Sequence, residues 1–369
     1  MSTTVRAAVL RAPSTPLAIE PLELGELRSH EVLVKLVATG ICHTDIAVMS
    51  RPFPVEQPIV LGHEGAGIVE AVGSAVSSVH PGDPVVMSYA SCGHCANCAK
   101  HAPMYCDYFF GSNFLGQRPD ASTALSSNGA PVRHSFFGQS SFATHSVCTD
   151  RNVVKVSTGV PLEKLGPLGC GIQTGAGAIF NVLKPGVGQS LAVFGVGSVG
   201  LAAVLAARTM GVARIIAVDL DDRRLALALE LGATDAINPA NIDTVTEVRR
   251  LAGSGVDFTF ETTGSMKVLR QAVDCLSSLG VCGFVGASAA GAELPLDVRD
   301  VMSRGKCIRG IVEGDANSQV FIPMLIELHE QGRFPFDKLL TFYPFEDIGQ
   351  AVADSISGKA VKAVLRFPD

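Results

Sequence analysis

The sequence predicts an α/β protein in which a β-rich first part is followed by a doubly wound parallel sheet. Before about residue 171, β-branched and partly alternating segments predominate, whereas strand-like and helix-like segments alternate from residue 172 onward. Hydrophobic residues make up 47% of the 369 residues and charged residues only 17%. The chain is therefore long and apolar enough for roughly two packed domains.

The β-rich part is indicated by residue type and alternation. Segments 32–37 and 66–72 contain several β-branched residues, mainly valine, and alternate in part, which favours strands. The stretch 109–141 is rich in Ser, Asn and Gly, so we expect irregular structure there. One hairpin is predicted within it, around Asn128-Gly129, because this dipeptide suits a tight turn with left-handed residues.

The alternation from residue 172 predicts a parallel sheet. Strands are expected at residues 190–194, 214–218, 257–260, 281–285 and 308–312, and helices at 199–210, 222–231 and 266–279. Repeated strand–helix–strand units form parallel sheets, because each helix returns the chain to the starting edge. After residue 314 the pattern is mixed again, and it ends in a predicted strand at 360–367.

Charge and hydropathy exclude several classes of protein. The formal net charge is −6 and the basic residues do not cluster, which argues against binding of nucleic acid or of an acidic membrane surface. No apolar run reaches the ~20 residues that a membrane-spanning helix needs, and the N-terminal residues show no signal-peptide pattern. We expect a cytoplasmic protein with no nucleic-acid and no membrane partner. Ten cysteines in that setting point to metal ligands and buried thiols.

A glycine-rich segment carries the strongest local motif. It consists of Gly195, Val196, Gly197, Ser198, Val199 and Gly200, which match G-x-G-x-x-G. The motif follows a predicted apolar strand and opens a predicted helix, as in a Rossmann dinucleotide site, where a pyrophosphate binds the helix N-terminus. Asp219 follows 19 residues after Gly200. Its carboxylate can accept from both ribose hydroxyls and would repel a 2′-phosphate, so the sequence predicts NAD rather than NADP.

Four clustered cysteines predict a closed metal site. Cys92, Cys95 and Cys98 stand at C-x2-C-x2-C spacing, and Cys106 follows eight residues later. Four thiolates can complete a tetrahedral zinc site, which is structural because no position is left for substrate. An iron–sulfur cluster and unliganded cysteines are the competing interpretations. The remaining cysteines, Cys148, Cys275, Cys282 and Cys307, are expected to be small buried residues.

Cys42, His63 and Cys170 form a second, dispersed group. Taken singly, each is more often an ordinary buried side chain, and spacing cannot join residues so far apart in sequence. Together, two cysteines and one histidine would make an open zinc site whose fourth position receives water or an alcohol.

The motifs together resemble the zinc-containing medium-chain alcohol dehydrogenase family over nearly the whole chain. The resemblance is carried by Gly62-His63-Glu64-x2-Gly67, by the four clustered cysteines, by the turn at Cys170 and by the glycine motif with Asp219. Segments 135–143, 166–175, 309–314 and 334–339 are most similar to the aryl (benzyl-type) alcohol dehydrogenases.

This resemblance implies a domain organisation. A GroES-like catalytic domain is expected over 1–171, with a structural zinc lobe at about 90–110. A Rossmann NAD-binding domain is expected over 172–314, and segment 315–369 returns to the catalytic domain. The family also implies two zinc ions per subunit, one catalytic and one structural, with NAD, and a homodimer or homotetramer joined through the Rossmann domain.

The resemblance also assigns roles near the catalytic zinc. Cys42, His63 and Cys170 would be the ligands, and Glu64 would lie behind the metal as a candidate alternate ligand. Asp45 would accept from the ring N–H of His63 and fix its orientation. Thr44 would hydrogen-bond the alcohol.

Cofactor and substrate contacts follow from the same resemblance. His43 and Lys362 would contact the pyrophosphate, Arg224 the adenine ribose, Thr174 and Val199 the nicotinamide, and Ile311 and Glu313 further parts of the cofactor. Candidates for the substrate pocket are Tyr89, Phe114 and Phe142, although plain core packing is an equal alternative for each. The chain departs from some members at Ala47, where they carry a histidine that passes the alcohol proton to solvent.

The sequence thus predicts reversible, NAD-dependent oxidation of a primary alcohol, most suitably an aromatic or allylic one, to the aldehyde. Three alternatives remain: a thiol-adduct (formaldehyde-type) dehydrogenase, a geraniol- or perillyl-type terpenoid alcohol dehydrogenase, and a non-catalytic regulatory or structural protein that binds NAD and zinc. A zinc-ribbon nucleic-acid binder is disfavoured by the acidic charge balance.

Overall fold

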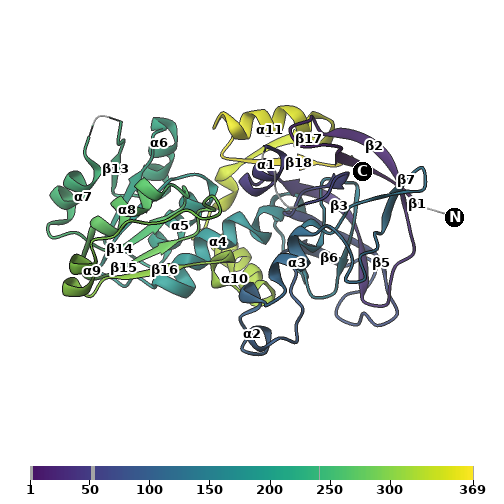
Figure 1. The fold of residues 1–369 in the computed structure, drawn as a ribbon, viewed down its shortest axis with the longest axis horizontal. Coiled ribbons are helices and arrows are strands. Elements are labelled where there is room, and N and C mark those ends of the chain that lie inside the picture. Colours follow the sequence, from purple (N-terminus) through teal and green to yellow (C-terminus); the bar gives the residue numbers. More distant parts are fainter. Residues whose placement is uncertain (1–2, 51–54, 241, 369) are drawn as a thin grey trace. The chain divides into compact units, whose positions relative to one another are not determined.

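The computed structural model describes residues 3–50, 55–240 and 242–368, and the chain divides into two compact units (Figure 1). The first unit consists of Met1–Cys170, Asn317–Glu330 and Asp337–Asp369, and the second of Gly171–Ala316 and Gln331–Phe336. The first unit is therefore built from both ends of the chain, and the second from its middle.

Two sheets form the first unit. The five-stranded sheet has the order β4 (Ile59–Val60), β1 (Thr3–Leu10), β2 (Ala18–Leu24), β7 (Leu125–Ser127), β8 (Ala130–Val132). The seven-stranded sheet has the order β10 (Val153–Lys155), β6 (Pro84–Met87), β5 (Gly65–Val72), β3 (Glu31–Gly40), β18 (Lys362–Arg366), β17 (Leu340–Pro344), and β9 (His145–Thr149) also pairs with β3. The C-terminal strand β18 runs antiparallel to β3, with Val364 opposite Gly40.

Strand β3 is the centre of this unit. Val32, Val34 and Leu36 are buried in one apolar cluster with residues of β5 and β6 such as Val69 and Val85. The predicted hairpin is confirmed: β7 and β8 pair antiparallel around Asn128-Gly129, and both turn residues have positive φ angles.

Five helices complete the description of the first unit. They are α1 (His43–Ser50), α2 (Ala96–Ala99), α3 (Phe109–Phe114), α10 (Ser318–Glu330) and α11 (Ile348–Ile356). Segment 109–141 is thus less irregular than expected, because α3 and the β7–β8 hairpin lie within it. In the described part of the chain, no helix is both long and apolar enough to cross a bilayer.

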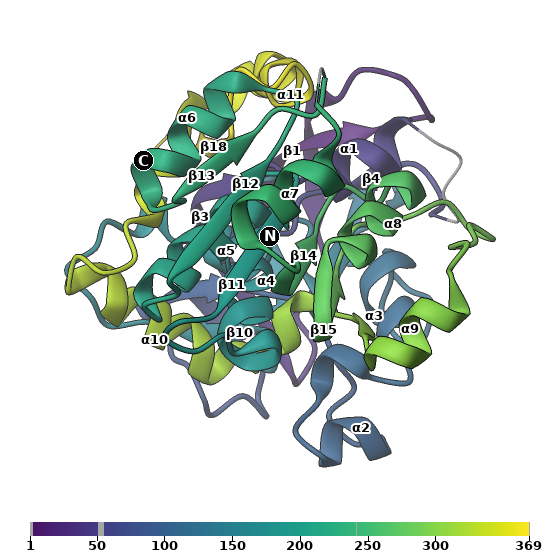
Figure 2. The same cartoon turned by 90° about the vertical axis from the view of Figure 1, so that its left-hand side faces the viewer.

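The second unit contains a parallel sheet of six strands. Its order is β13 (Asp235–Ile237), β12 (Arg214–Val218), β11 (Ser190–Phe194), β14 (Val256–Glu261), β15 (Leu276–Phe284), β16 (Cys307–Gly310). Every neighbouring pair is parallel, and Figure 2 shows β12, β11 and β14 running side by side. Numbered from β11, the order is 3-2-1-4-5-6, the Rossmann arrangement. The predicted doubly wound α/β class is confirmed.

The helices of this unit alternate with its strands. They are α4 (Gly171–Gly177), α5 (Ser198–Thr209), α6 (Asp222–Leu231), α7 (Thr244–Ala252), α8 (Met266–Asp274) and α9 (Val298–Arg304). The core holds Phe194, Ile216, Val248 and Leu269 among other buried residues.

Two sequence expectations, one about a helix end and one about the unassigned cysteines, are wrong. The helix expected over 266–279 ends at Asp274, because Leu276 already begins β15 and pairs with Val256. Cys148, Cys275 and Cys282 are buried as expected, but Cys307 is exposed because β16 is the edge strand of the sheet.

Candidate metal centres and dinucleotide site

The dispersed ligand candidates meet in the first unit. Cys42 stands between β3 and α1, His63 between β4 and β5, and Cys170 directly after a short 3-10 turn, Gly166–Gly169. One potential ligand atom from each, together with one from Glu64, lies within 4.8 Å of all the others. The fold therefore brings together residues that are up to 128 positions apart, as the numbering shows.

Glycines allow the turn that carries Cys170 to approach the sheet. A Cβ on Gly166 would lie 2.3 Å from the carbonyl oxygen of Glu64, and one on Gly169 would lie 2.0 Å from that of Met87. Any side chain at either position would displace the turn, and with it the Cys170 thiol. Gly166 and Gly169 are thus packing requirements of the ligand cluster.

Asp45 ties two ligand segments together. Its Oδ1 lies 2.9 Å from His63 Nδ1 and accepts from the Gly62 N–H at 3.0 Å, while Oδ2 accepts from the Cys42 N–H at 3.0 Å. Asp45 is fully buried. It therefore fixes the ring that carries Nδ1–H and directs the other nitrogen, Nε2, away from itself.

The donor set fits a zinc ion. His63 Nε2 is buried and is one of the few such atoms with no hydrogen-bond partner in the described residues. A buried polar nitrogen without a partner is costly unless a metal or ligand meets it. A hydrogen bond with Cys170, aided by His63 and Lys362, lowers the pKa of Cys42 well below its usual value despite burial. An imidazole nitrogen and two cysteines, one of them disposed to be a thiolate, are ligands that zinc prefers.

Lys362 forms a buried ion pair with Glu64. Its Nζ lies 2.8 and 2.9 Å from the two carboxylate oxygens of Glu64 and donates to the carbonyl of Ile41 at 3.1 Å. Lys362 is only 2% exposed. The prediction that it contacts the cofactor pyrophosphate is wrong for this structure, because its ammonium is enclosed and committed to Glu64.

Glu64 occupies space that a glycine leaves free. A Cβ on Gly40 would lie 2.1 Å from Glu64 Oε2, so a larger residue there would displace the carboxylate. Burial raises the pKa of Glu64, although Lys362 opposes that shift. One carboxylate oxygen still lies within 4.8 Å of the candidate ligand atoms of the two cysteines and of His63. Its position is consistent with the reserve ligand suggested by the sequence, and this role stays a proposal.

A strained turn, residues 135–141, clamps the His63 loop. Gln139 Nε2 donates to the carbonyl of His63 at 2.8 Å, and Gln139 Oε1 accepts from the Gly65 N–H at 3.1 Å. Ser140 Oγ donates to the carbonyl of Val60 at 2.5 Å. Ser135, Phe137, Gly138 and Ser140 all have positive φ angles. Such backbone strain persists only where surrounding contacts enforce it, and it is common at functional sites.

Aromatic rings gather beside His63. The Phe137 ring stacks on the imidazole with centroids 4.4 Å apart, and Phe136 meets it edge-on at 5.6 Å. Phe114 packs against Phe137 at 5.0 Å and Phe109 does so at 6.4 Å. These rings form an aromatic wall next to the metal cluster. Sequence reasoning did not assign Phe109, Phe136 or Phe137 to a pocket, although the last two stand within the segment that resembles aryl alcohol dehydrogenases.

The three aromatic residues predicted to line the substrate pocket lie in different environments. Phe114 belongs to the aromatic wall, and Tyr89 reaches its margin, with its ring 5.9 Å from that of Phe109. Phe142 is fully buried, and its ring and backbone lie directly over Gly62. The prediction for Phe142 is wrong, because this residue packs in the core behind the His63 loop.

The four clustered cysteines form a compact second group. The sulfur atoms of Cys92, Cys95, Cys98 and Cys106 all lie within 4.8 Å of one another. Backbone N–H groups point at these sulfurs, as in the bond from Cys92 N to Cys106 Sγ at 3.3 Å. N–H groups of Asp107 and Cys98 lower the pKa of Cys95 to about 6. Burial raises the pKa of Cys98 and raises that of Cys106 to about 12. The compact arrangement of four sulfurs, rather than a shared preference for thiolates, is what fits a closed zinc site.

The glycine motif lies between β11 and α5 in the second unit. Gly195 has φ of +84°, and a Cβ there would be 2.6 Å from Thr262 Oγ1, while a Cβ on Gly200 would be 2.0 Å from the Gly195 carbonyl. These two glycines are required by the turn and by close helix packing. A Cβ on Gly197 would meet nothing within 4 Å. The fold does not require that glycine, whereas a pyrophosphate approaching the N-terminus of α5 would.

Asp219 closes the same site from the end of β12. Its two carboxylate oxygens accept from the N–H groups of Val196 at 2.8 Å and Asp221 at 2.9 Å. Arg224 Nη1 lies 4.0 Å from the carboxylate, and the buried Nε of Arg224 has no hydrogen-bond partner in the described residues. Val196 is buried, whereas Ser198 and Val199 are half-buried at the start of α5.

The remaining predicted cofactor residues lie in varied settings. Glu313 is buried, and its Oε2 accepts from Gln173 Nε2 at 3.2 Å and Thr174 Oγ1 at 3.5 Å. Ile311 directs its side chain into the core, onto Gly283. In the first unit, His43 is exposed at the start of α1, and Thr44 Oγ1 lies 3.8 Å from Cys42 Sγ.

Comparison with known proteins agrees with this arrangement. Residues 28–158 match the alcohol dehydrogenase GroES-like domain, and residues 198–330 match the zinc-binding dehydrogenase family. A geraniol dehydrogenase from Castellaniella defragrans is 47% identical over 364 residues, which cover 98% of this chain and 97% of the relative.

Two solved structures are similar along their whole length. An alcohol dehydrogenase zinc-binding domain protein from Burkholderia ambifaria is 52% identical, with a TM-score of 0.98 and 100% of both chains covered. A benzyl alcohol dehydrogenase from Acinetobacter calcoaceticus is 45% identical, with a TM-score of 0.96, and the match covers 99% of this chain and 100% of that one. The chain belongs to the zinc-containing medium-chain alcohol dehydrogenase family.

Proposed function

We propose that the protein oxidises primary alcohols whose carbinol carbon is bonded to an aromatic or alkene carbon, with NAD+ as hydride acceptor, and that it catalyses the reverse reduction. One observation carries the proposal. The Asp45-oriented imidazole of His63 presents a partnerless Nε2 to two cysteines, and an aromatic wall flanks the same imidazole. This arrangement combines a metal-ligand set with a surface suited to a flat, unsaturated substrate.

Cys42, His63 and Cys170 would hold the catalytic zinc, and zinc bound there supplies Lewis-acid polarisation of the substrate oxygen. The Thr44 hydroxyl, 3.8 Å from Cys42 Sγ, would hydrogen-bond an alcohol at that cluster and receive its proton. Asp45 keeps His63 in the tautomer that leaves Nε2 free as a donor atom.

NAD is favoured over NADP by Asp219. Its carboxylate is held in place by two backbone N–H groups, so its charge cannot easily move away from a ribose 2′ position. A 2′-phosphate would meet that charge, whereas two ribose hydroxyls would donate to it. Arg224 Nη1 lies 4.0 Å from the Asp219 carboxylate and offsets part of its negative charge. The preference for NAD over NADP therefore depends on the Asp219 carboxylate.

The substrate class rests on the aromatic wall and on the relatives. Stacked and edge-on rings prefer flat unsaturated partners to a short aliphatic chain. Similar proteins include a geraniol dehydrogenase and a benzyl alcohol dehydrogenase. In both named alcohols the carbinol carbon is bonded to an unsaturated carbon. Geraniol-type allylic alcohols are therefore included with benzylic ones in the proposed range.

The proton leaves this site by a route other than a histidine at position 47. Ala47 has no titratable group, so beyond Thr44 and the cofactor ribose the proton would pass to water or to another base. We also propose two zinc ions per chain, with Cys92, Cys95, Cys98 and Cys106 holding the structural one.

A substrate panel with metal analysis tests the proposal. Zinc-loaded enzyme is assayed for NADH with benzyl alcohol, cinnamyl alcohol, geraniol and ethanol, and for NADPH with the same alcohols. We expect the first three to exceed ethanol in kcat/KM, with about two zinc ions per chain. Formaldehyde turnover that strictly requires glutathione would favour a thiol-adduct dehydrogenase instead. Absence of activity with every alcohol, despite full zinc content, would favour a non-catalytic binding protein.

A further inference from the structure

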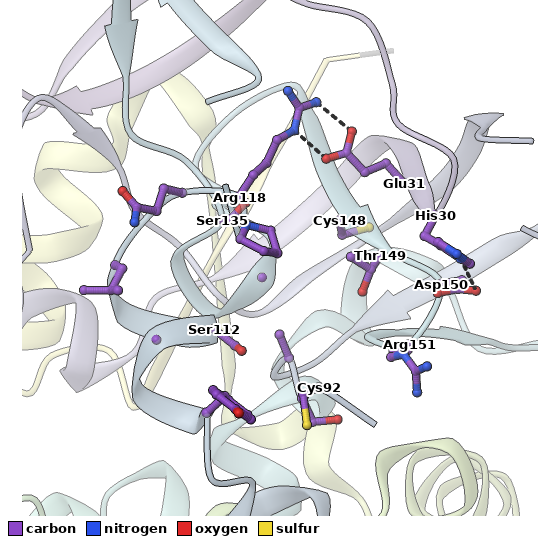
Figure 3. Close-up of a pocket in the computed structure, with 18 of the residues that line it drawn as sticks. His30, Glu31, Cys92, Ser112, Arg118, Ser135, Cys148, Thr149, Asp150 and Arg151 are labelled. Atoms are coloured by element: carbon purple, nitrogen blue, oxygen red, sulfur yellow. Dashed lines mark hydrogen bonds and ion pairs between the residues drawn. The ribbon is translucent and has the colours of Figure 1, made fainter. Parts of the chain in front are cut away.

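The first unit contains a cavity of about 640 Å³ that the proposed reaction does not use. Its walls come from residues 30–31, from the four-cysteine segment, and from α3 with the chain that follows it (Figure 3). A further wall is formed by residues 147–151, which are the last three residues of β9 and the two that follow. None of Cys42, His63, Glu64 or Cys170 lines it. The volume lies in the range of small-molecule sites, about 300–1,000 Å³.

One side of the cavity is apolar. Val147 and Cys148 of β9 contribute to it, as do Leu115 and Pro119 from the segment after α3. Val147 and Cys148 are buried, so their positions are fixed by the sheet. A ligand with an apolar body would find a preformed surface there, and its burial would be favourable.

An ion pair between Arg118 and Glu31 forms another wall of the cavity. Arg118 Nε and Nη2 lie 2.6 and 2.7 Å from the carboxylate oxygens of Glu31, and Figure 3 shows the two side chains facing each other. Arg118 also donates to the carbonyls of Glu26 and Thr123. Because these groups are mostly committed to one another, the pair shapes the cavity rather than offering a charge to a ligand.

Arg151 is different. It is exposed, lines the cavity and forms no ion pair with any carboxylate in the described residues. The neighbouring acid, Asp150, lies 3.8 Å from His30 Nδ1 and is thus directed to another partner. Ser112 and Thr149 place hydroxyl groups on the same cavity. A guanidinium beside an apolar surface is suited to a carboxylate that carries an apolar body.

The four-cysteine segment forms part of the cavity wall. Cys92 lines it directly. A Cβ on Gly93 would fall 1.6 Å from Arg151 Nη1, so the guanidinium lies against the backbone of that segment. A ligand that fixes Arg151 would therefore also restrain the chain around Cys92.

We propose that this cavity is a second, non-catalytic binding site for small aromatic or cyclic monocarboxylates. The carboxylate binds Arg151, the apolar body lies on Val147, Cys148 and Leu115, and occupancy stabilises the four-cysteine segment. Asp150 disfavours a second negative charge, so dicarboxylates bind more weakly than monocarboxylates.

The test uses the full-length, zinc-loaded protein and 4-fluorobenzoate, with binding followed by fluorine NMR in the absence of cofactor and alcohol. We expect a site that Arg151→Gln weakens about tenfold or more, because a charge-assisted bidentate contact is lost. Val147→Phe, which fills the apolar side, should abolish the same signal. The matched control Arg304→Gln, an exposed arginine of α9, should bind as the wild type does.

A second readout links the site to the metal. Bound 4-fluorobenzoate should slow chelator-driven release of one zinc ion in the wild type and in Arg304→Gln, but not in Arg151→Gln. Neutral 4-fluorobenzamide should bind more weakly, and phthalate should do so too. Equal 4-fluorobenzoate affinity in the wild type, Arg151→Gln and Val147→Phe would overturn the proposal, since all binding would then lie elsewhere. The readouts need no turnover, so their failure is distinct from failure of the proposed reaction.

Discussion

Gln139 holds the backbone directly after the His63 side chain: its Nε2 donates to the His63 carbonyl at 2.8 Å, and its Oε1 accepts from the Gly65 N–H at 3.1 Å. Gln139 is 1% exposed, so neither contact is shared with bulk water. The position of the His63 ligand is therefore set from two directions, by Asp45 at the ring and by Gln139 at the backbone.

Replacing Gln139 with methionine should weaken zinc binding at the His63 cluster. Methionine has similar length but cannot bond to the His63 carbonyl or the Gly65 N–H, and each unsatisfied buried group costs about 1–3 kcal/mol. Loss of such supporting contacts typically costs about 10–100-fold in metal affinity or activity. Zinc release to a chelator, measured together with kcat/KM for benzyl alcohol, checks this expectation.

The matched control is Gln350→Met on α11, where the exposed amide donates to Asp354 and, among the described residues, to no other side chain. It should retain wild-type zinc binding. Unchanged zinc release in Gln139→Met would show that Asp45 alone suffices to hold the ligand.

Replacing Asp219 with glycine should weaken NAD and relax discrimination against NADP. The substitution removes the acceptor for the ribose hydroxyls together with the charge that opposes a 2′-phosphate. The ratio of kcat/KM values for the two cofactors should shift toward NADP by about tenfold or more, since one well-placed charge contact is worth about 1.5–3 kcal/mol. Asp222→Asn, at the start of α6, is a control that alters charge without removing the Asp219 carboxylate. A wild-type cofactor ratio in Asp219→Gly would refute the assigned role.

His134 should make the protein less stable in acid. Burial, aided by the nearby Arg118 charge, lowers the pKa of His134 from 6.5 to about 3, so the folded state keeps it neutral while the unfolded state binds a proton. Because the unfolded state then holds more protons, stability falls by about 1.4 kcal/mol per pH unit as pH drops from about 6.5 towards 3. His134→Gln should lose this component. Denaturant unfolding of both proteins between pH 7 and 5 gives the difference in slope, and parallel curves would contradict the assignment.

The edge of the Rossmann sheet should form the subunit interface. Strand β16 is the last strand of the sheet and its residues are largely exposed. Leu279, Val298 and Met302 are 80%, 76% and 73% exposed, and Figure 1 shows α9 beside β15 and β16. We expect two copies of β16 to pair across a twofold axis, which would satisfy the open edge and cover these apolar side chains.

Light scattering coupled to size-exclusion chromatography checks this interface. The double variant Val298→Glu/Met302→Glu should have a smaller molar mass than the wild type, because it places two charges in the interface. Val187→Glu/Val320→Glu changes equally exposed apolar residues elsewhere and should leave the mass unchanged. Equal masses for all three proteins would place the interface on another surface.

The two classes of site differed in how far sequence could predict them. The glycine motif and Asp219 are read from local spacing, since a strand, a turn and a helix place them within one structural unit. The four cysteines are close in sequence and meet for the same reason. The structure adds that Gly195 and Gly200 are required by packing, whereas Gly197 leaves open space.

The errors arose where distant segments meet. The family resemblance predicts that Lys362 contacts the cofactor, but β18 pairs with β3 and brings its ammonium to Glu64. Phe142 follows a motif that marks a pocket, yet its ring faces Gly62 in the core. Residue type could not distinguish these outcomes, because a lysine or a phenylalanine suits either environment.

By itself, the sequence determined the doubly wound sheet, the dinucleotide turn and the four-cysteine group, because each depends on periodicity or short spacing. Only the tertiary structure decided that Cys42, His63 and Cys170 meet, that Asp45 and Gln139 fix the imidazole between them, and that Phe137 covers its face. The physical reason is that these contacts join strands and turns far apart along the chain. Their geometry follows from sheet register and close glycine packing, which no local pattern encodes.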